Sequence, residues 1–375
     1  MRIGVPAESR PGERRVALVP EHVQRLVKDG HEVAVERGAG RAALADDDAY
    51  VAAGAHPCDE AEALAADVVV HVAALDPARI ARLAPTGVTL GFCSPTGEPA
   101  AVRAALARGV TSFAFELLPR ISRAQSMDAL SSQALVTGYR SALVAADRLP
   151  RFFPLLMTAA GTVPPAKVLV LGAGVAGLQA IATARRLGAV VEAYDVRAAA
   201  AEEVRSMGAT FVELDLDSLE GAGGYAREMT EDRAQRQREL LAPYVAAADA
   251  LILTAAVPGR RAPLLVTGDM VAGMKPGSVV VDLAAESGGN CDVSRPGEEV
   301  DHHGVLVWGA RDVASQLPVH AAKLYSANVF ALLALLAGED GSLAPRWEDE
   351  IVAGSWVTRD GTLRDGITLP GEDPA

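Results

Sequence analysis

The sequence predicts an α/β protein of two domains with parallel sheets, joined by long helices and with a cleft between them. Short apolar runs alternate with amphipathic stretches in two series, first over residues 2–115 and again over residues 167–308. Such alternation is typical of βαβ units. The length of 375 residues is about twice that of a usual domain. Only 4% of residues are aromatic, which favours close packing of helices on sheets.

The first series contains five apolar runs that we expect to be strands, at residues 2–6, 32–36, 68–72, 88–92 and 111–115. Helices are predicted at residues 21–29 and 99–108. Apolar residues in 127–146 are then spaced for one helical face, so a long connecting helix is expected there.

The second series contains six predicted strands, at residues 168–171, 190–194, 210–212, 250–254, 278–283 and 305–308. Six strands in such a series indicate a complete Rossmann-like domain. Another long helix is expected at 318–336, followed by a glycine-rich tail with short strands. Two long helices around the second series suggest that the chain leaves the first domain and returns to it. We therefore expect an N-terminal Rossmann-like domain of residues 1–129, completed by 330–375, and a second domain of 130–329.

Composition narrows the function classes. A net charge of −13 would repel nucleic-acid phosphates and anionic lipid, so neither is an expected partner. The three cysteines lie far apart without a CxxC pair, which predicts neither disulfides nor a metal site and fits a reducing cytoplasm. The chain begins on a strand-like MRIGVPAE without a secretory signal. No apolar run reaches the ~20 residues of a membrane span, so membrane association is expected only through a partner.

The strongest motif is KVLVLGAGVAG. An apolar strand precedes Gly172, Gly174 and Gly177, which open a helix, and Asp195 ends the next strand. This is the pattern of a dinucleotide-binding turn, although a glycine-rich turn without a ligand is the alternative. The glycines permit a tight turn, close approach of a pyrophosphate and close helix packing. A carboxylate at Asp195 would accept hydrogen bonds from ribose hydroxyls and repel a 2′-phosphate. This predicts a preference for NAD(H) over NADP(H). The positive charge of Arg197 nearby would act against that preference.

Residues 215–241 interrupt the alternation of strands and helices. They are small and acidic up to about residue 224 and highly charged afterwards. Such a charged run is either the solvated face of a helix or a mobile loop of about residues 220–240 over a ligand. Loops longer than ~12 to 15 residues inside a compact domain are usually functional, so the two interpretations carry equal weight.

The segment RISRAQSMDALSSQ, residues 120–133, concentrates guanidinium, amide, carboxylate and hydroxyl groups between apolar stretches. Burying so many polar groups without a polar ligand would be costly. In a cleft between domains they could position a carboxamide or a carboxylate. The alternative is helix N-capping, by Ser122 with Gln125 or by Ser126 with Asp128.

From IGVPAE and ERRVALVP through PRISRAQSMDALSSQA and LAAESGGNCD to LPVHAAKLYSANV, nearly the whole chain resembles the alanine dehydrogenase and pyridine nucleotide transhydrogenase superfamily. Within it, the resemblance is strongest to domain I, the soluble NAD(H)-binding alpha subunit of bacterial proton-translocating transhydrogenases. This implies a homodimer docked at the inner face of the plasma membrane on transmembrane subunits that bind NADP(H). It also implies direct hydride transfer between NADH and NADP, coupled to proton translocation.

The same resemblance implies roles for individual residues. Arg120, Gln125 and Asp128 would orient the nicotinamide and its ribose. Tyr225 would fold over the bound nucleotide, which favours the mobile loop. Besides the glycines and Asp195, further cofactor contacts are expected at Ser131, Ala173, Val175, Val196, Arg197, Gly224, Gln237 and Ala256.

An alanine dehydrogenase is the alternative enzyme. Arg15 matches the substrate arginine of that branch, but Ala73 and Ser94 stand where it has a lysine and a histidine. Oxidation of an amine needs a general base, whereas transfer between two nicotinamides needs only positioning. His71 is a conceivable substitute base, although one histidine ending an apolar strand is more typical of a structural role. An NAD-binding regulatory subunit is the third interpretation.

Overall fold

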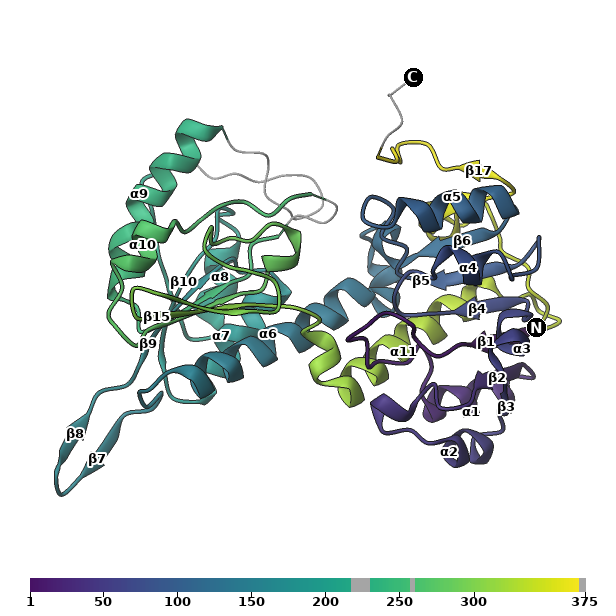
Figure 1. Ribbon diagram of the computed structural model, residues 1–375, viewed down its shortest axis with the longest axis horizontal. Coiled ribbons are helices and arrows are strands. Elements are labelled where there is room, and N and C mark those ends of the chain that lie inside the picture. Colours follow the sequence, from purple (N-terminus) through teal and green to yellow (C-terminus); the bar gives the residue numbers. More distant parts are fainter. Residues whose placement is uncertain (217–229, 257–259, 371–375) are drawn as a thin grey trace. The chain divides into compact units, whose positions relative to one another are not determined.

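The computed structural model describes residues 1–216, 230–256 and 260–370. Gly224 and Tyr225 lie outside these residues. The chain forms two compact units (Figure 1), unit 1 from Met1–Gln133 with Ser315–Ala375, and unit 2 from Ala134–Ala314. The chain therefore leaves unit 1, completes unit 2 and then returns to unit 1.

Unit 1 is built on an eight-stranded sheet in the order β17-β16-β6-β5-β4-β1-β2-β3. Its strands are β1 (Arg2–Val5), β2 (Glu32–Glu36), β3 (His56–Cys58), β4 (Val68–Val70), β5 (Val88–Gly91), β6 (Thr111–Ala114), β16 (Trp356–Arg359) and β17 (Thr362–Leu363). Neighbours from β6 to β3 are parallel. The returning segment adds β16 and β17 antiparallel at one edge, so the C-terminal segment of the chain completes the N-terminal sheet.

The helices of unit 1 are α1 (Pro20–Lys28), α2 (Asp47–Ala52), α3 (Glu60–Leu64), α4 (Pro77–Ile80), α5 (Pro99–Arg108), α11 (Pro318–Leu336) and α12 (Glu350–Ser355), with 3₁₀ turns η1 (Arg41–Ala43), η2 (Phe115–Leu117) and η3 (Ser122–Met127). The apolar α11 is central to the core, since Tyr325, Val329 and Leu333 have no exposed surface. It is also, within the described ranges, the helix long and apolar enough to cross a membrane, and half of it is buried inside the protein. Its apolar character is thus explained by packing.

Unit 2 is built on a seven-stranded sheet in the order β11-β10-β9-β12-β13-β15-β14. Its strands are β9 (Lys167–Leu171), β10 (Val190–Tyr194), β11 (Thr210–Phe211), β12 (Ala250–Leu253), β13 (Val279–Asp282), β14 (Glu299–His302) and β15 (Val305–Gly309). All neighbours are parallel except β14 with β15. The strand order reverses between β9 and β12, which makes this the switch point where such sheets bind ligands.

Helices cover both faces of the sheet in unit 2. They are α7 (Val175–Arg186), α8 (Ala200–Ser206), α9 (Glu231–Ala247) and α10 (Gly268–Ala272), with η5 (Ala285–Ser287), while α6 (Ala129–Arg148) and η6 (Ala314–Gln316) cross the unit boundaries. Val168 and Val170 of β9 pack with α6, α7 and α8. The alternating residues Leu169 and Leu171 pack with α9 and α10. A sheet buried on both faces explains why its strands are continuously apolar.

The two mostly parallel sheets with their helices confirm the predicted α/β class. Strands β3 and β14 were not among the predicted strands, and two further elements differ from the expectation. A hairpin of β7 (Leu156–Thr158) and β8 (Gly161–Val163) precedes β9, and it was not predicted because its residues are all exposed and show no alternation. The charged run is helical from Glu231 onward, in α9, so the solvated-helix interpretation holds for that stretch. Residues 217–229 lie outside the described chain.

Candidate functional site

The glycine-rich motif forms a tight turn between β9 and α7. Gly172 has a φ of 98°, in the region that favours glycine. A Cβ added to Gly177 would lie 1.9 Å from the carbonyl oxygen of Gly172, so α7 can begin this close to β9 only with glycine there. Gly174 precedes α7, and a Cβ added to it would meet nothing within 4 Å. The conformational roles predicted for Gly172 and Gly177 are confirmed, and the N-terminus of α7 opens to space that an anion could enter.

Asp195 lies at the end of β10, beside this turn. Its carboxylate accepts hydrogen bonds from the backbone N–H of Ala173 at 2.7 Å and of Arg197 at 2.9 Å. The Arg197 guanidinium adds two more, from Nε at 2.9 Å and Nη2 at 3.0 Å. A carboxylate has about four acceptor positions, so ribose hydroxyls would have to displace the Arg197 side chain. The Ala173 N–H, expected at the pyrophosphate, donates to Asp195.

The other predicted contacts in unit 2 differ in exposure. Val175 is exposed in the first turn of α7, Val196 is partly buried, and Ala256 is exposed after β12. Gln237 is only 2% exposed, and its Nε2 donates to the Tyr194 hydroxyl at 3.2 Å. In this structure Gln237 therefore ties α9 to the end of β10.

The polar segment 120–133 of unit 1 combines a helix cap with exposed side chains. The Asp128 carboxylate accepts from the Ser131 backbone N–H at 2.9 Å and from the Ser131 hydroxyl at 2.5 Å. Asp128 thus caps α6, as the N-capping alternative anticipated, although its partner is Ser131. Arg120 and Gln125 are exposed.

Buried polar side chains of α11 anchor this segment. The Asn328 amide donates to the Ser126 carbonyl at 2.9 Å and accepts from the Ser132 hydroxyl at 2.7 Å. Gln133 Nε2 donates to the Ala321 carbonyl at 3.1 Å. The segment is thus held to α11 at three points, one on its backbone and two on its side chains, which limits its conformational freedom.

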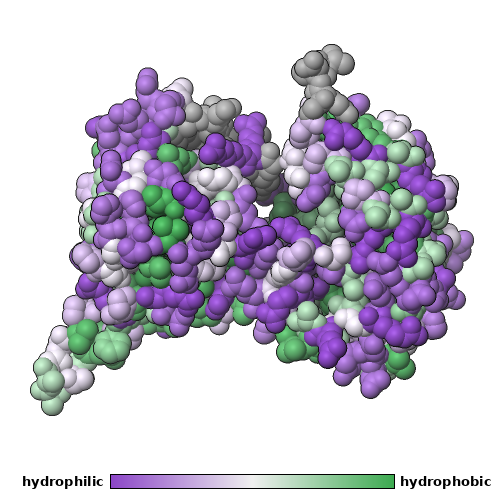
Figure 2. Space-filling model, in the orientation of Figure 1, coloured by the Kyte–Doolittle hydropathy of each residue, from purple (hydrophilic) through white to green (hydrophobic). Residues whose placement is uncertain are grey.

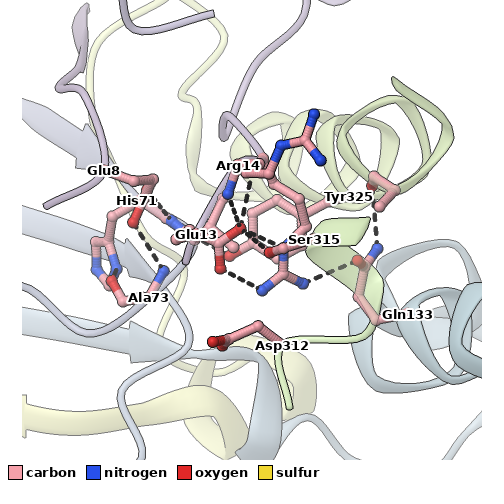
Figure 3. A network of polar contacts seen from close by, with 12 residues as sticks. Glu8, Glu13, Arg14, His71, Ala73, Gln133, Asp312, Ser315 and Tyr325 are labelled. Carbon is pink, nitrogen blue, oxygen red and sulfur yellow. Dashed lines mark hydrogen bonds and ion pairs between the residues drawn. The ribbon is translucent and has the colours of Figure 1, made fainter. Parts of the chain in front are cut away.

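A buried ion pair near this segment was not foreseen as such (Figure 3). Arg15 donates from Nε and Nη2 to the Glu13 carboxylate, at 2.8 and 2.6 Å, and from Nη1 to Gln133 at 2.9 Å. The Ser315 hydroxyl also donates to Glu13, at 2.5 Å. Burial alone would raise the pKa of Glu13, but the hydrogen bonds and charge of Arg15 hold it below its usual value. In the sequence, Glu13 and Arg15 belong to a charged ERR run, and the resemblance singled out Arg15 alone, as the match of a substrate arginine.

Glu8 and His71 extend the same network (Figure 3). The Glu8 carboxylate accepts from the backbone N–H groups of Val72 at 2.6 Å and Ala73 at 3.1 Å, and burial raises its pKa to about 7. His71 is 1% exposed, and burial lowers its pKa to about 4. Its Nδ1 is paired with the Ala73 carbonyl at 2.8 Å. His71 is therefore neutral and buried near pH 7, which supports the structural interpretation of this residue.

Comparisons with known proteins agree with this architecture. The model of the alanine dehydrogenase/PNT N-terminal domain matches residues 4–137, and that of the C-terminal domain matches residues 141–366. The chain belongs to the alanine dehydrogenase/PNT family. The predicted family is thereby confirmed.

Three relatives show where in the family the chain lies. It is 47% identical over 374 residues to the first segment of NAD(P) transhydrogenase subunit alpha of Rhodospirillum rubrum, covering 97% of both chains. It is 32% identical to alanine dehydrogenase of Mycobacterium tuberculosis, over 85% of this chain and 82% of that one. The crystal structure of transhydrogenase from Sinorhizobium meliloti has 41% identity and a TM-score of 0.85, covering 97% of this chain and 98% of that one. The chain is thus more similar to the transhydrogenase branch than to this dehydrogenase.

Mutations can distinguish the structural role of Gly177 from a ligand-binding role of Gly174. Gly177→Ala should lower the thermal unfolding midpoint, because its Cβ would collide with backbone, at a cost of about 1–3 kcal/mol. Gly174→Thr should leave stability nearly unchanged, since threonine is a good N-cap, but weaken NADH binding at least about tenfold by filling the space before α7. Thermal unfolding and NADH fluorescence titration measure the two effects. NADH binding by Gly174→Thr at wild-type strength would show that the ligand does not approach this helix end.

Glu8 should make the stability of unit 1 depend on pH. Its folded pKa of about 7 exceeds the ordinary value of 4.5, so its stabilising contribution is complete below pH 4.5 and is lost as pH rises through 7. The loss is about 1–3 kcal/mol. Glu8→Gln should remove this decline, whereas Glu32→Gln, exposed at the start of β2, should keep it. Hydrogen exchange of β1 and β4 amides between pH 5 and 8 measures the slope for unit 1 alone, and parallel slopes for wild type and Glu8→Gln would contradict the assignment.

Proposed function

We propose that this chain binds NAD(H) in unit 2 and transfers hydride directly between NADH and NADP bound on a partner subunit. Proton translocation by membrane subunits would be coupled to that transfer. The observation that carries the proposal is the 47% identity, over 97% of both chains, to the Rhodospirillum rubrum NAD(P) transhydrogenase alpha segment. The glycine-rich turn with Asp195 at the end of the next strand supplies the matching nucleotide chemistry.

The polar segment 120–133 has the properties that this reaction requires. Hydride transfer between two nicotinamides moves no proton at the reacting carbons, so holding the rings about 3–3.5 Å apart is the main catalytic task. Arg120, Gln125 and Asp128, with Ser131, are proposed to orient the nicotinamide and its ribose. Their anchoring by α11 supports this role, because a fixed backbone limits the motion of the side chains. Tyr225 and Gly224 are proposed to cover the bound nucleotide.

The proposed contact residues in unit 2 bind different parts of the dinucleotide. Gly172, Gly174 and Gly177, with Ala173 and Val175, are proposed to lie against the pyrophosphate at the N-terminus of α7. Asp195, Val196 and Arg197 are proposed to hold the adenosine ribose. Gln237 and Ala256 complete the proposed set. For Gln237 its buried position favours an indirect role, through Tyr194 beside Asp195.

Alanine dehydrogenase is the competing activity because of the 32% identity to that enzyme. Three features of unit 1 count against it. Any substrate carboxylate at Arg15 would compete with Glu13. His71 is neutral and buried. Ala73 and Ser94 have no ionisable side chain, so neither supplies the general base that oxidation of an amine needs.

The assembly that the proposal requires is a homodimer that binds transmembrane subunits and so stays at the inner face of the plasma membrane. The hairpin β7–β8 supports a docked chain. Leu155 and Met157 are 52% and 77% exposed, and Figure 2 shows hydrophobic surface on this projection. Apolar side chains presented in this way usually mark an interaction surface. A stable monomer in sedimentation equilibrium would contradict the dimer.

The isolated chain should bind NADH and show no turnover of alanine or pyruvate with NAD(H). Binding of NADPH should be much weaker, because the Asp195 carboxylate repels a 2′-phosphate, and Asp195→Asn should narrow the difference. Equilibrium dialysis with both nucleotides and an absorbance assay with alanine and NAD test these points. Measurable alanine turnover would make alanine dehydrogenase the better assignment. Equal affinity for NADH and NADPH would show that Asp195 does not discriminate against the 2′-phosphate.

Gln125 has no ionisable group, so its proposed role is geometric. Gln125→Asn should leave NADH affinity nearly unchanged and slow hydride transfer to partner-bound NADP by about 10²-fold, since a ring displaced by ~1 Å reacts that much more slowly. Gln24→Asn, exposed in α1, is the matched control and should transfer at the wild-type rate. Stopped-flow mixing with the NADP-binding partner gives the rate. A loss of affinity equal to the loss of rate would show that Gln125 contributes only uniform binding.

A further inference from the structure

The buried ion pair of unit 1 is linked to the polar segment 120–133 by hydrogen bonds. Arg15, which pairs with Glu13, also donates from Nη1 to Gln133 Oε1 at 2.9 Å (Figure 3). Gln133 Nε2 in turn donates to the Ser132 hydroxyl at 3.2 Å. The ion pair is therefore connected to the beginning of α6 through one amide side chain.

The hydrogen bonds continue from Ser132 to the backbone near Gln125. The Ser132 hydroxyl donates to Asn328 Oδ1 at 2.7 Å, and Asn328 Nδ2 donates to the Ser126 carbonyl oxygen at 2.9 Å. Ser126 follows Gln125 directly in the chain. The network that begins at the ion pair therefore ends on the backbone beside Gln125.

Every hydrogen bond of this network is donated in the same direction, from the ion pair toward Ser126. A guanidinium can only donate, and a carbonyl oxygen can only accept. Arg15 therefore requires the oxygen of the Gln133 amide to face it, and the Ser126 carbonyl requires the nitrogen of the Asn328 amide. Neither amide can turn over without losing hydrogen bonds at both of its ends. The two ends of the network thus fix the orientation of the groups between them.

Stability alone is a poor explanation for this network. Gln133 and Asn328 are only 7% and 6% exposed, and the side chain of Glu13 is 2% exposed. Buried ion pairs can often be replaced by apolar side chains of similar size without loss of stability. A satisfied polar network instead specifies one arrangement of the groups that it joins. Here that arrangement is the conformation of the segment that carries Gln125 and Asp128.

Asn328 holds two neighbouring elements of that segment together. Its partner Ser126 lies in η3, as does Gln125, and its partner Ser132 lies in the first turn of α6. Asp128 lies between the two elements and caps α6. Without the Asn328 amide, η3 would lose a hydrogen bond that fixes it relative to α6 and α11. The side chain of Gln125 would then have more freedom to move.

We infer that Arg15 and Asn328 are positioning residues for Gln125. They hold the η3 turn from the two ends of one network, and neither of them touches the nucleotide. This inference rests on the proposed function and deepens it. It assigns Arg15 a role in hydride transfer, in place of the substrate binding that its match in the dehydrogenase branch implies.

Asn328→Ala should slow hydride transfer and leave NADH binding unchanged. Transfer to partner-bound NADP should become at least about tenfold slower, since a ring displaced by ~1 Å reacts about 10²-fold more slowly. The dissociation constant of NADH should stay within about twofold, because the glycine-rich turn and Asp195 belong to the other unit. Stopped-flow mixing of the full-length chain with the NADP-binding partner gives the rate, and NADH fluorescence titration gives the constant.

Arg15→Lys tests the other end of the network. Lysine keeps the positive charge beside Glu13, but its single ammonium group lacks the planar fork with which arginine reaches both Glu13 and Gln133. Transfer should again slow, by a smaller factor, at unchanged NADH affinity. Because the charge is conserved, this variant also serves if Asn328→Ala does not fold.

Ser326→Ala is the matched control. Ser326 lies on α11 like Asn328 and has no exposed surface, and its hydroxyl accepts from the Val19 N–H at 3.0 Å. Its partners Val19 and His22 do not belong to the network. The variant should therefore lower the thermal midpoint and transfer hydride at the wild-type rate.

A double variant shows whether Asn328 acts through Gln125. In a Gln125→Ala background, Asn328→Ala should slow transfer by less than about a further twofold, because the side chain that it positions has been removed. Residues that act independently would instead multiply their losses.

The outcomes are distinct. Slower transfer in Asn328→Ala and Arg15→Lys, with NADH affinity and Ser326→Ala unaffected, supports the inference. Unchanged transfer in either variant, a loss of affinity equal to the loss of rate, equal slowing in Ser326→Ala, or multiplied losses in the double variant would overturn it. A wild-type chain that binds NADH and transfers no hydride would overturn the proposed function, and this inference with it.

Discussion

The packing of backbone where β9 ends is the constraint on which the glycine-rich end of unit 2 depends. The left-handed Gly172, the absence of a side chain at Gly177 and the Thr254 hydroxyl bring three chain segments within contact of one another. Any side chain at Gly177 would push α7 away from β9 and from the end of β12. Asp195 joins this turn from the end of β10, because its carboxylate accepts a hydrogen bond from the Ala173 N–H.

Unit 1 differs from unit 2 in that it buries charged and amide side chains in an otherwise apolar interior. Burying Glu13 and Arg15 would be costly for either alone, and their mutual hydrogen bonds offset much of that cost. Burial raises the pKa of Glu8, whose hydrogen-bond donors among the described residues are the backbone N–H groups of Val72 and Ala73. The contrast between two carboxylates in one cluster shows that the partner, more than burial, decides which one stays ionised near pH 7.

The sequence predicted regular elements well and polar networks poorly. The strand 190–194 and the helices 99–108 and 318–336 were predicted with their observed bounds, because buried strands and apolar helical faces repeat at short, readable spacings. The β7–β8 hairpin carries no such pattern, since both of its faces are exposed. The ion pair of Glu13 and Arg15 lies in a charged run of the sequence. Its further partners Gln133 and Ser315 are 118 and 302 residues away along the chain, so no local spacing reveals the network.

Some of the site residues could likewise be identified from local sequence patterns, and others could not. Gly172 and Gly177 could be identified because their conformational requirements are local and a motif records them. The anchoring of residues 120–133 by Asn328 could not, since about 200 residues of chain separate the partners. Resemblance to a family supplied Arg120 and Gln125, because exposed side chains do not take part in the periodic apolar patterns that reveal packed residues.

The return of the chain to unit 1 has a consequence for its synthesis. Unit 2 is one continuous segment, whereas unit 1 lacks α11, β16 and β17 until the last sixty or so residues are made. A ribosome therefore releases the N-terminal strands β1 to β6 long before the helix that buries their apolar side chains exists. Contacts between residues this far apart in sequence form slowly. Unit 2 can fold while unit 1 is still incomplete and exposes apolar surface. The N-terminal part of the nascent chain is therefore the part most exposed to aggregation during synthesis.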